Sequence, residues 1–428
     1  MLTATLLLAI AMLATGILRS RDASWGSGAD RGAGLAWAAA LFAAGPLLAV
    51  YFGVRGGDLI PLLLGPLLFA AFQVTPRPSL TETITLLRRI LRLYVWGSLA
   101  AAVLAPEWAF PTTVEVRSTR DLFGFGLPQL AGLTTNPNLL GQLAALSLVL
   151  ESAALARRRS WPVHAAAATA CVLLSQSRTS LVASALGLLL LRSAWNRTPM
   201  RATLTTLGVL GAGCLALLLP GLQSTLVKLD KVDLNGRNTA WAFAINEFRA
   251  HPLFGYGPRL FSPEYRREVL GERYNWIGQA HGQLPQTLGE AGMVGGIGLA
   301  TLAIAVTVAA VRTARVTAGL SLALCTVLLV ACLSECPLRQ VTPASFGAIM
   351  PFTVWCLLLT ALPVRTEKLG RTALRPLSRD ATALPGSLPQ RPPDCPARTR
   401  DRTAGSERGE ETRLPPVSTP VASLGTSA

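Results

Sequence analysis

The chain has 428 residues, of which 51% are hydrophobic and 14% are charged, and its formal net charge is +16. A soluble globular protein carries about 25% charged residues, so this composition disfavours an ordinary soluble domain. The positive charge lies in short clusters between apolar stretches and in the C-terminal tail. No basic patch with interleaved aromatic residues is present, which argues against a nucleic-acid partner.

Long apolar runs follow one another along the chain. A hydrocarbon core of about 30 Å requires roughly 20 apolar residues per helix, and a backbone inside lipid must satisfy its own hydrogen bonds. We therefore predict an all-α polytopic membrane protein with about eleven transmembrane helices. The first run has no charged leading region, so we expect a spanning helix there rather than a signal peptide. The predicted spans are 2–18, 34–54, 58–75, 89–106, 138–156, 161–176, 179–192, 202–222, 285–311, 316–333 and 343–362.

Arginines in the short loops predict the orientation of these helices, because basic residues favour the cytoplasmic side. They group at 88–92, 157–159, 192–201 and 312–315, on alternate loops, and the C-terminal tail falls on the same side. With eleven helices the N-terminus lies outside. The predicted outer segments are 107–135, 175–179 and 223–284.

The segment 223–284 is the longest predicted loop. It divides the chain into N-terminal helices (1–222), an extracytoplasmic loop (223–284), C-terminal helices (285–362) and a tail (363–428). A loop of about sixty residues is uncommon in a compact protein and is usually functional. Apolar residues recur at helical spacing within 235–250, so we predict a helix on the membrane surface that ends at His251-Pro252.

The tail and the cysteines carry no predicted chemistry. Residues 363–428 are rich in proline, serine, threonine and charge, which predicts a disordered cytoplasmic tail. Most of the seven cysteines lie in or beside apolar runs, where cysteine behaves as a small hydrophobic residue. We therefore expect no metal site and no cofactor.

Arg178 interrupts an otherwise apolar stretch, in the sequence Ser177-Arg178-Thr179-Ser180. An arginine at the centre of a membrane helix costs roughly 2.5–3.5 kcal/mol, so such residues are functional candidates. The alternative is an interfacial arginine that reaches the surface from a tight turn. All other arginine clusters among the predicted spans lie on the opposite side, which favours a functional role.

Arg237 and His281 are the candidates in the long loop. Arg237 opens the predicted surface helix, where a planar guanidinium and a helix N-terminus together suit phosphate oxygens. It is equally compatible with a surface arginine in a charged loop. His281 lies where the loop returns to the membrane, and histidine is the usual general base near neutral pH. A lone histidine is more often structural. Beyond it, Gly292 and Gly296 have the spacing of close helix packing.

Taken in order, five segments resemble motifs of the O-antigen ligase/polymerase superfamily of membrane glycosyltransferases, and the resemblance extends over about residues 34–362. At position 282 this chain has glycine where the family usually has asparagine, so a hydrogen bond to the histidine or the substrate is expected to be missing. The segments are Asn136-Pro137-Asn138, Ser177-Arg178-Thr179, Gly236-Arg237 with Trp241, Pro252-Leu253-Phe254-Gly255-Tyr256-Gly257, and Ala280-His281 with Glu290-Ala291-Gly292.

The resemblance implies a GT-C-like membrane enzyme. It would transfer a glycan from an undecaprenyl-diphosphate-type carrier to an acceptor hydroxyl at the outer face of the bacterial cytoplasmic membrane, without metal. Arg178 and Arg237 would bind the diphosphate, and His281 would activate the acceptor. Fixed cations near a leaving diphosphate would stabilise its developing charge.

Two questions stay open at this point. A transporter or flippase of lipid-linked glycan would have a similar number of helices, although such proteins often contain internal repeats and none is evident here. Within the enzyme class, the acceptor is undefined. It is lipid A core in a ligase that completes lipopolysaccharide, a second lipid-linked glycan in a polymerase, or a protein.

Overall fold

The computed structural model describes residues 29–54, 78–110, 127–134, 136–153, 161–195, 208, 237–270, 277–339 and 349–363, which are helices joined by short turns and connections. All of them belong to the first of two compact units, Met1–Lys368 and Leu369–Ala428. The predicted spans at 2–18 and 58–75, nearly all of that at 202–222, and the tail beyond residue 363 lie outside the described residues.

Each remaining predicted span coincides with a helix. This confirms the all-α class for the described part of the chain. Among the described residues, two helices are long and apolar enough to cross a membrane, over Gly34–Phe52 and Gln283–Thr313, and the total of about eleven spans stays a prediction. The helices are α2 (Ala29–Phe52), α4 (Leu80–Leu104), α7 (Pro137–Ser152), α8 (Trp161–Leu174), α9 (Arg178–Trp195), α14 (Gln283–Thr313), α15 (Leu320–Ser334) and α16 (Ile349–Ala361).

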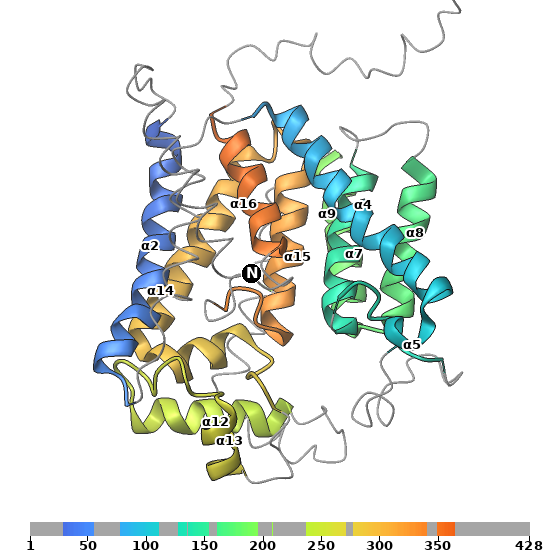
Figure 1. Cartoon of the computed structure of the whole chain (residues 1–428). Coiled ribbons are helices and arrows are strands. Elements are labelled where there is room, and N and C mark those ends of the chain that lie inside the picture. The colour runs from blue at the N-terminus through green and yellow to red at the C-terminus, as the bar shows by residue number, and fades with distance from the viewer. Residues whose placement is uncertain are drawn as a thin grey trace, which may run out of the picture. The chain divides into compact units, whose positions relative to one another are not determined.

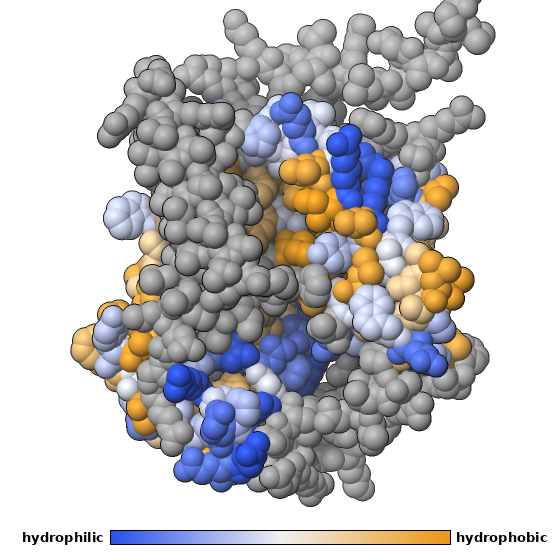
Figure 2. Space-filling view, viewed as in Figure 1, coloured by the Kyte–Doolittle hydropathy of each residue, from blue (hydrophilic) through white to orange (hydrophobic). Residues whose placement is uncertain are grey.

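In the described ranges, three further helices lie between these. They are α5 (Pro106–Ala109), α12 (Arg237–Ala250) and α13 (Pro263–Leu270). Helix α12 confirms the helix predicted at 235–250, and it ends just before His251-Pro252, as predicted. On the face drawn in Figure 2, hydrophilic residues gather where α12 and α13 lie and again over the first half of α4, with apolar residues between them.

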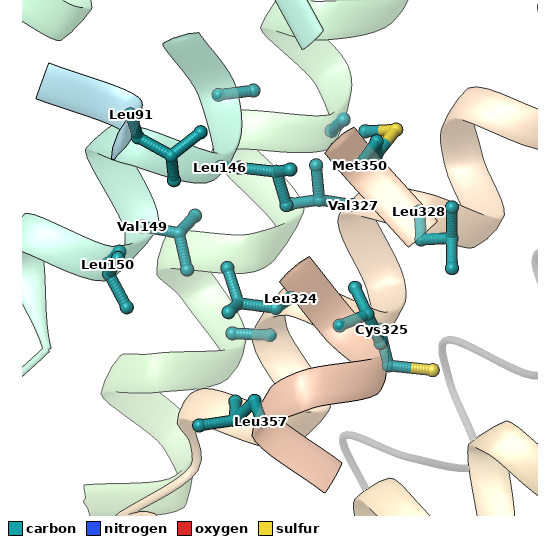
Figure 3. Packing of buried hydrophobic residues seen from close by; sticks show 14 of the residues in the cluster. Leu91, Leu146, Val149, Leu150, Leu324, Cys325, Val327, Leu328, Met350 and Leu357 are labelled. Atoms are coloured by element: carbon teal, nitrogen blue, oxygen red, sulfur yellow. The ribbon is translucent and has the colours of Figure 1, made fainter. Parts of the chain in front are cut away.

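The core is built from leucine-rich faces of α4, α7, α15 and α16. Leu91, Leu146 and Leu324 are almost completely buried there. Figure 3 shows side chains of these four helices pointing toward one another, with Val327 and Met350 among them. Cys325 is part of the same cluster, as expected for a cysteine that acts as a small hydrophobic residue.

Helix α14 is broken at Gly292, where φ is 60° and ψ is −154°. Figure 1 shows its two parts meeting at an angle, with the second part beside α2. The break corrects the expectation of one continuous apolar helix over 285–311. The second part, residues 293–313, has 21 residues and is therefore about 30 Å long, enough to cross a bilayer.

The segment 252–257 fills the break by hydrogen bonding to both parts of α14. The N–H groups of Met293 and Val294 donate to the carbonyls of Pro252 and Leu253, at 2.8 and 3.3 Å. In the other direction, the segment's own N–H groups at positions 256 and 257 donate to the carbonyls of residues 289 and 290. Helical backbone that loses its own partners is tolerated at membrane depth only when protein groups replace them.

Two glycines make this approach possible. Gly255 and Gly292 both have positive φ, and a Cβ on either would meet the other's backbone nitrogen at 2.6 Å. Helices α2 and α14 also pack closely, since a Cβ on Gly45 would lie 2.7 Å from the Cα of Gly295. Glycine therefore serves close packing in this part of α14, and the contact with α2 involves Gly295 and Gly298.

Candidate functional site

Glu335 is the centre of the polar site. It follows the last residue of α15, and its side chain is 9% exposed. Each carboxylate oxygen receives hydrogen bonds from residues far away in the sequence. Oε1 accepts from Asn138 Nδ2 and Arg237 Nη2, both at 2.8 Å. Oε2 accepts from Gln279 Nε2 at 3.1 Å and contacts His281 Nδ1 at 3.3 Å.

Asn138 is placed by the start of α7. The side chain of Asn136 caps this helix and accepts a hydrogen bond from the N–H of Asn138, while Pro137 occupies the first helical position. Proline suits that position because its missing N–H is not needed there. The Asn-Pro-Asn motif thus begins a helix and directs a buried amide at Glu335.

Arg237 begins α12 and forms an ion pair with Glu335, and its side chain is 17% exposed. Helix α12 rests on the first part of α14. The contact is close because a Cβ on Gly289 would lie 3.0 Å from the carbonyl oxygen of Ala244. The arginine predicted to bind diphosphate is therefore partly buried and holds a carboxylate in this structure.

Aromatic residues hold α12 and α13 together. Phe243, Tyr256, Phe261 and Tyr265 form a separate cluster, in which the two tyrosine rings stack with centroids 4.2 Å apart. Burial raises the pKa of Tyr265, and its hydrogen bond to Glu247 at 2.7 Å raises it further. The tyrosine hydroxyl is therefore a stable donor that links α13 to α12.

His281 immediately precedes the residue that caps α14. Its φ is 51°, and its side chain is 18% exposed. The N–H of Ala280 donates to Gln286 Oε1 at 2.6 Å, and the indole N–H of Trp241 donates to the carbonyl of His281 at 3.3 Å. An ionised carboxylate only accepts hydrogen bonds, so a hydrogen bond from Nδ1 to Glu335 requires the imidazole tautomer that has its proton on Nδ1 and its lone pair on Nε2.

Arg178 is the first residue of α9, and its side chain is exposed. It has no ion-pair or hydrogen-bond partner within the described ranges. Its neighbour Thr179 shares a 2.6 Å hydrogen bond with Ser334, the residue before Glu335. The first turn of α9 therefore lies beside the end of α15, on the same side of the bundle as Arg237 and His281.

Sequence reasoning missed the residue that organises the site. Glu335 is the only acidic residue between Glu290 and Glu367, and it ends the apolar run at 316–333. The argument that made Arg178 a candidate, an ionisable group beside apolar sequence, applies equally to this carboxylate. Asn138 was marked only by the resemblance of the Asn-Pro-Asn motif and not by its chemistry, and Gln279 carries no signal in the sequence.

A second ion pair supports the first part of α14. Arg339 Nη2 contacts Glu290 at 3.0 Å, and its Nη1 donates to the carbonyl of Gly278 at 2.9 Å. This arginine joins the segment after α15 to the segment just before His281. Glu290 of the Glu-Ala-Gly motif therefore has Arg339 as its partner, whereas His281 contacts Glu335.

The charges of the site favour an anionic ligand. Arg178 and Arg237 contribute two positive charges, and Glu335 contributes one negative charge that is already engaged by three donors and contacted by His281. Across the described ranges, no three histidine, cysteine or acidic side chains are grouped as metal ligands would be. The expectation of metal-independent chemistry stays a prediction.

Residues 163–300, about a third of the chain, match the family model described as O-antigen ligase. This match confirms the resemblance to the O-antigen ligase superfamily. The matched region runs from α8 to the second part of α14 and includes Arg178, Arg237 and His281. It supports a membrane glycosyltransferase of the ligase or polymerase type. No curated protein matches the chain.

Proposed function

We propose that the protein transfers a glycan from a polyprenyl-diphosphate carrier to an acceptor hydroxyl at the extracytoplasmic face of the bacterial cytoplasmic membrane. The observation that carries the proposal is the contact of Arg237 and His281 with the single carboxylate of Glu335, with Arg178 exposed on the adjacent helix end. A fixed base and exposed positive charge on one side of a membrane bundle suit a reaction with an anionic leaving group.

His281 is proposed as the general base. Its Nε2 takes the proton of the acceptor hydroxyl, the hydroxyl oxygen forms a bond to the anomeric carbon, and the bond from that carbon to the diphosphate oxygen breaks. The electron pair leaves with the carrier diphosphate. The Glu335 carboxylate next to Nδ1 stabilises the imidazolium that forms, as a buried acid does in other histidine-based sites.

Arg178 and Arg237 are proposed to bind the diphosphate. Arg178 is available without a structural change, because its guanidinium is exposed at the N-terminus of α9, where backbone N–H groups also favour anions. Arg237 is shared with Glu335 and retains donors beyond the one used there. Two fixed cations would then neutralise the leaving group without a metal.

The test is accumulation of lipid-linked glycan in cells that express variants at normal protein level. We expect His281→Ala and Arg178→Ala each to lower transfer by about 10²-fold or more, because each removes a group that acts in the transition state. Arg89→Ala and His251→Ala are matched controls, since Arg89 is an exposed arginine of α4 and His251 lies outside the Glu335 site. We expect both controls to retain transfer.

Normal transfer by both His281→Ala and Arg178→Ala would overturn the proposal. Flipping of labelled lipid-linked glycan by the purified protein in vesicles would favour a transporter instead. The acceptor is a separate question: glycan chain length in a deletion strain distinguishes a polymerase, which makes long chains, from a ligase, which attaches them.

A further inference from the structure

His281 has a backbone conformation that L-amino acids rarely adopt. Its φ of 51° lies in the left-handed region, as does that of Gln176 and Ala318 among the non-glycine residues described. Such a conformation costs about 1–3 kcal/mol and persists only when the surrounding structure holds it. Glycine would adopt it at no cost, so the choice of histidine here requires a compensating set of contacts.

Two side chains hold the backbone on either side of His281. Gln286, which is 1% exposed, accepts from the N–H of Ala280 at 2.6 Å. Trp241 donates its indole N–H to the carbonyl of His281 at 3.3 Å. The two residues come from different helices, because Gln286 belongs to the first part of α14 and Trp241 to α12.

Trp241 also lies close to Gly282, the residue that follows His281. A Cβ on Gly282 would lie 3.0 Å from the indole nitrogen of Trp241 and 3.4 Å from the carbonyl oxygen of Leu333. The backbone after His281 is thus enclosed between α12 and the end of α15. Rotation of this peptide away from its position would require the indole to move.

The conformation of the backbone sets the direction of the imidazole. If φ of His281 relaxed to a negative value, the Cα–Cβ bond would turn and Nδ1 would leave Glu335, which it contacts at 3.3 Å. We propose that Trp241 and Gln286 are positioning residues that clamp His281 in its left-handed conformation and so direct Nε2 at the acceptor hydroxyl. This inference rests on the proposed role of His281 as the base.

The test compares two clamp variants with two matched controls in the full-length protein. Trp241→Phe removes the indole N–H and retains most of the ring, and Gln286→Met removes the acceptor at similar volume. Trp108→Phe alters an exposed tryptophan, and Gln283→Met removes a buried glutamine of the same half-helix that bonds Leu338 instead. Two readouts are measured: kcat and donor KM, and the rate at which diethyl pyrocarbonate modifies His281.

We expect each clamp variant to lower kcat by between about ten- and a hundredfold with donor KM nearly unchanged, because the base is misdirected while the diphosphate site persists. Modification of His281 should become faster in the same variants. Unchanged kcat and unchanged modification rate would overturn the clamp, as would equal losses in the controls. If His281→Ala retains transfer, the proposed base is wrong, while the modification rates still report on the clamp.

Discussion

Helix α7 connects two buried carboxylates, Glu335 and Glu151, whose hydrogen-bonding partners differ. Near its first turn, Asn138 donates to Glu335, and near its last turn the helix carries Glu151. Thirteen residues separate these positions, which is about 20 Å along the axis. Glu151 is held by two arginines of α4, Arg88 and Arg92, and its side chain is 1% exposed.

The difference between the two carboxylates lies in their partners. Both guanidinium groups at Glu151 come from one helix, and each donates two hydrogen bonds to the carboxylate, so the cluster is closed. Glu335 has an arginine of α12, an amide of α7, and a histidine and an amide of the segment before α14. Arg178, which has no partner among the described residues, lies on the adjacent helix end. A buried ion pair alone does not mark a reactive site, whereas a carboxylate that orients a titratable group does.

The largest effect, on the free energy of unfolding, should come from breaking the cluster of Glu151 with Arg88 and Arg92. Glu151→Ala leaves two arginines, one of them 7% exposed, without their counter-charge. We expect the free energy of unfolding in detergent to fall by about 3–5 kcal/mol, because uncompensated buried charge is costly. Transfer per folded molecule should stay near wild type. A loss below about 1 kcal/mol would contradict the view that this cluster is structural.

At Glu335 we expect a smaller decrease in the free energy of unfolding and a large decrease in the rate of transfer. Glu335→Gln retains the volume and one acceptor, but it places an amide N–H opposite His281 Nδ1 and favours the wrong tautomer. We expect transfer to fall by about a hundredfold, measured as kcat with donor in excess. Glu335→Asp is the control that retains the charge. Wild-type kcat in Glu335→Gln would show that the carboxylate does not orient the base.

The smallest effect is expected at Gly282, the residue after His281. Gly282→Asn introduces the residue usual in the family, yet the position is enclosed by Trp241 at 3.0 Å from the new Cβ. We expect a cost of about 1 kcal/mol from overpacking, seen as a decrease of about fivefold in kcat. Increased activity would instead indicate that asparagine supplies a hydrogen bond that this chain lacks.

Much of the fold followed from the sequence because hydrophobic run length and helical spacing are local signals. The start of α12 and its end before Pro252 were predicted to within about two residues. The break in α14 was not predicted, since positive φ at Gly292 depends on a loop that is distant in sequence. Glycine spacing alone indicated close packing but did not identify the partner.

The candidate site was predicted less completely than the fold. Arg178, Arg237 and His281 were found from residue chemistry and from their resemblance to family motifs, and the structure gathers them at the end of α15. Their assigned roles stay predictions. Glu335 was missed because its partners become neighbours only through tertiary packing, across separations of 54 to 197 residues.

The broken helix also has a consequence for how the chain enters the membrane. The nine residues 283–291 are too short and too polar to partition into lipid alone, whereas 293–313 is a full insertion unit. The insertion machinery would therefore recognise only the second part. Residues 252–257 are synthesised earlier, so they are already present to pair with the exposed end once it is in the bilayer. Pairing of residues 252–257 with α14 is in this sense a step that follows insertion of residues 293–313.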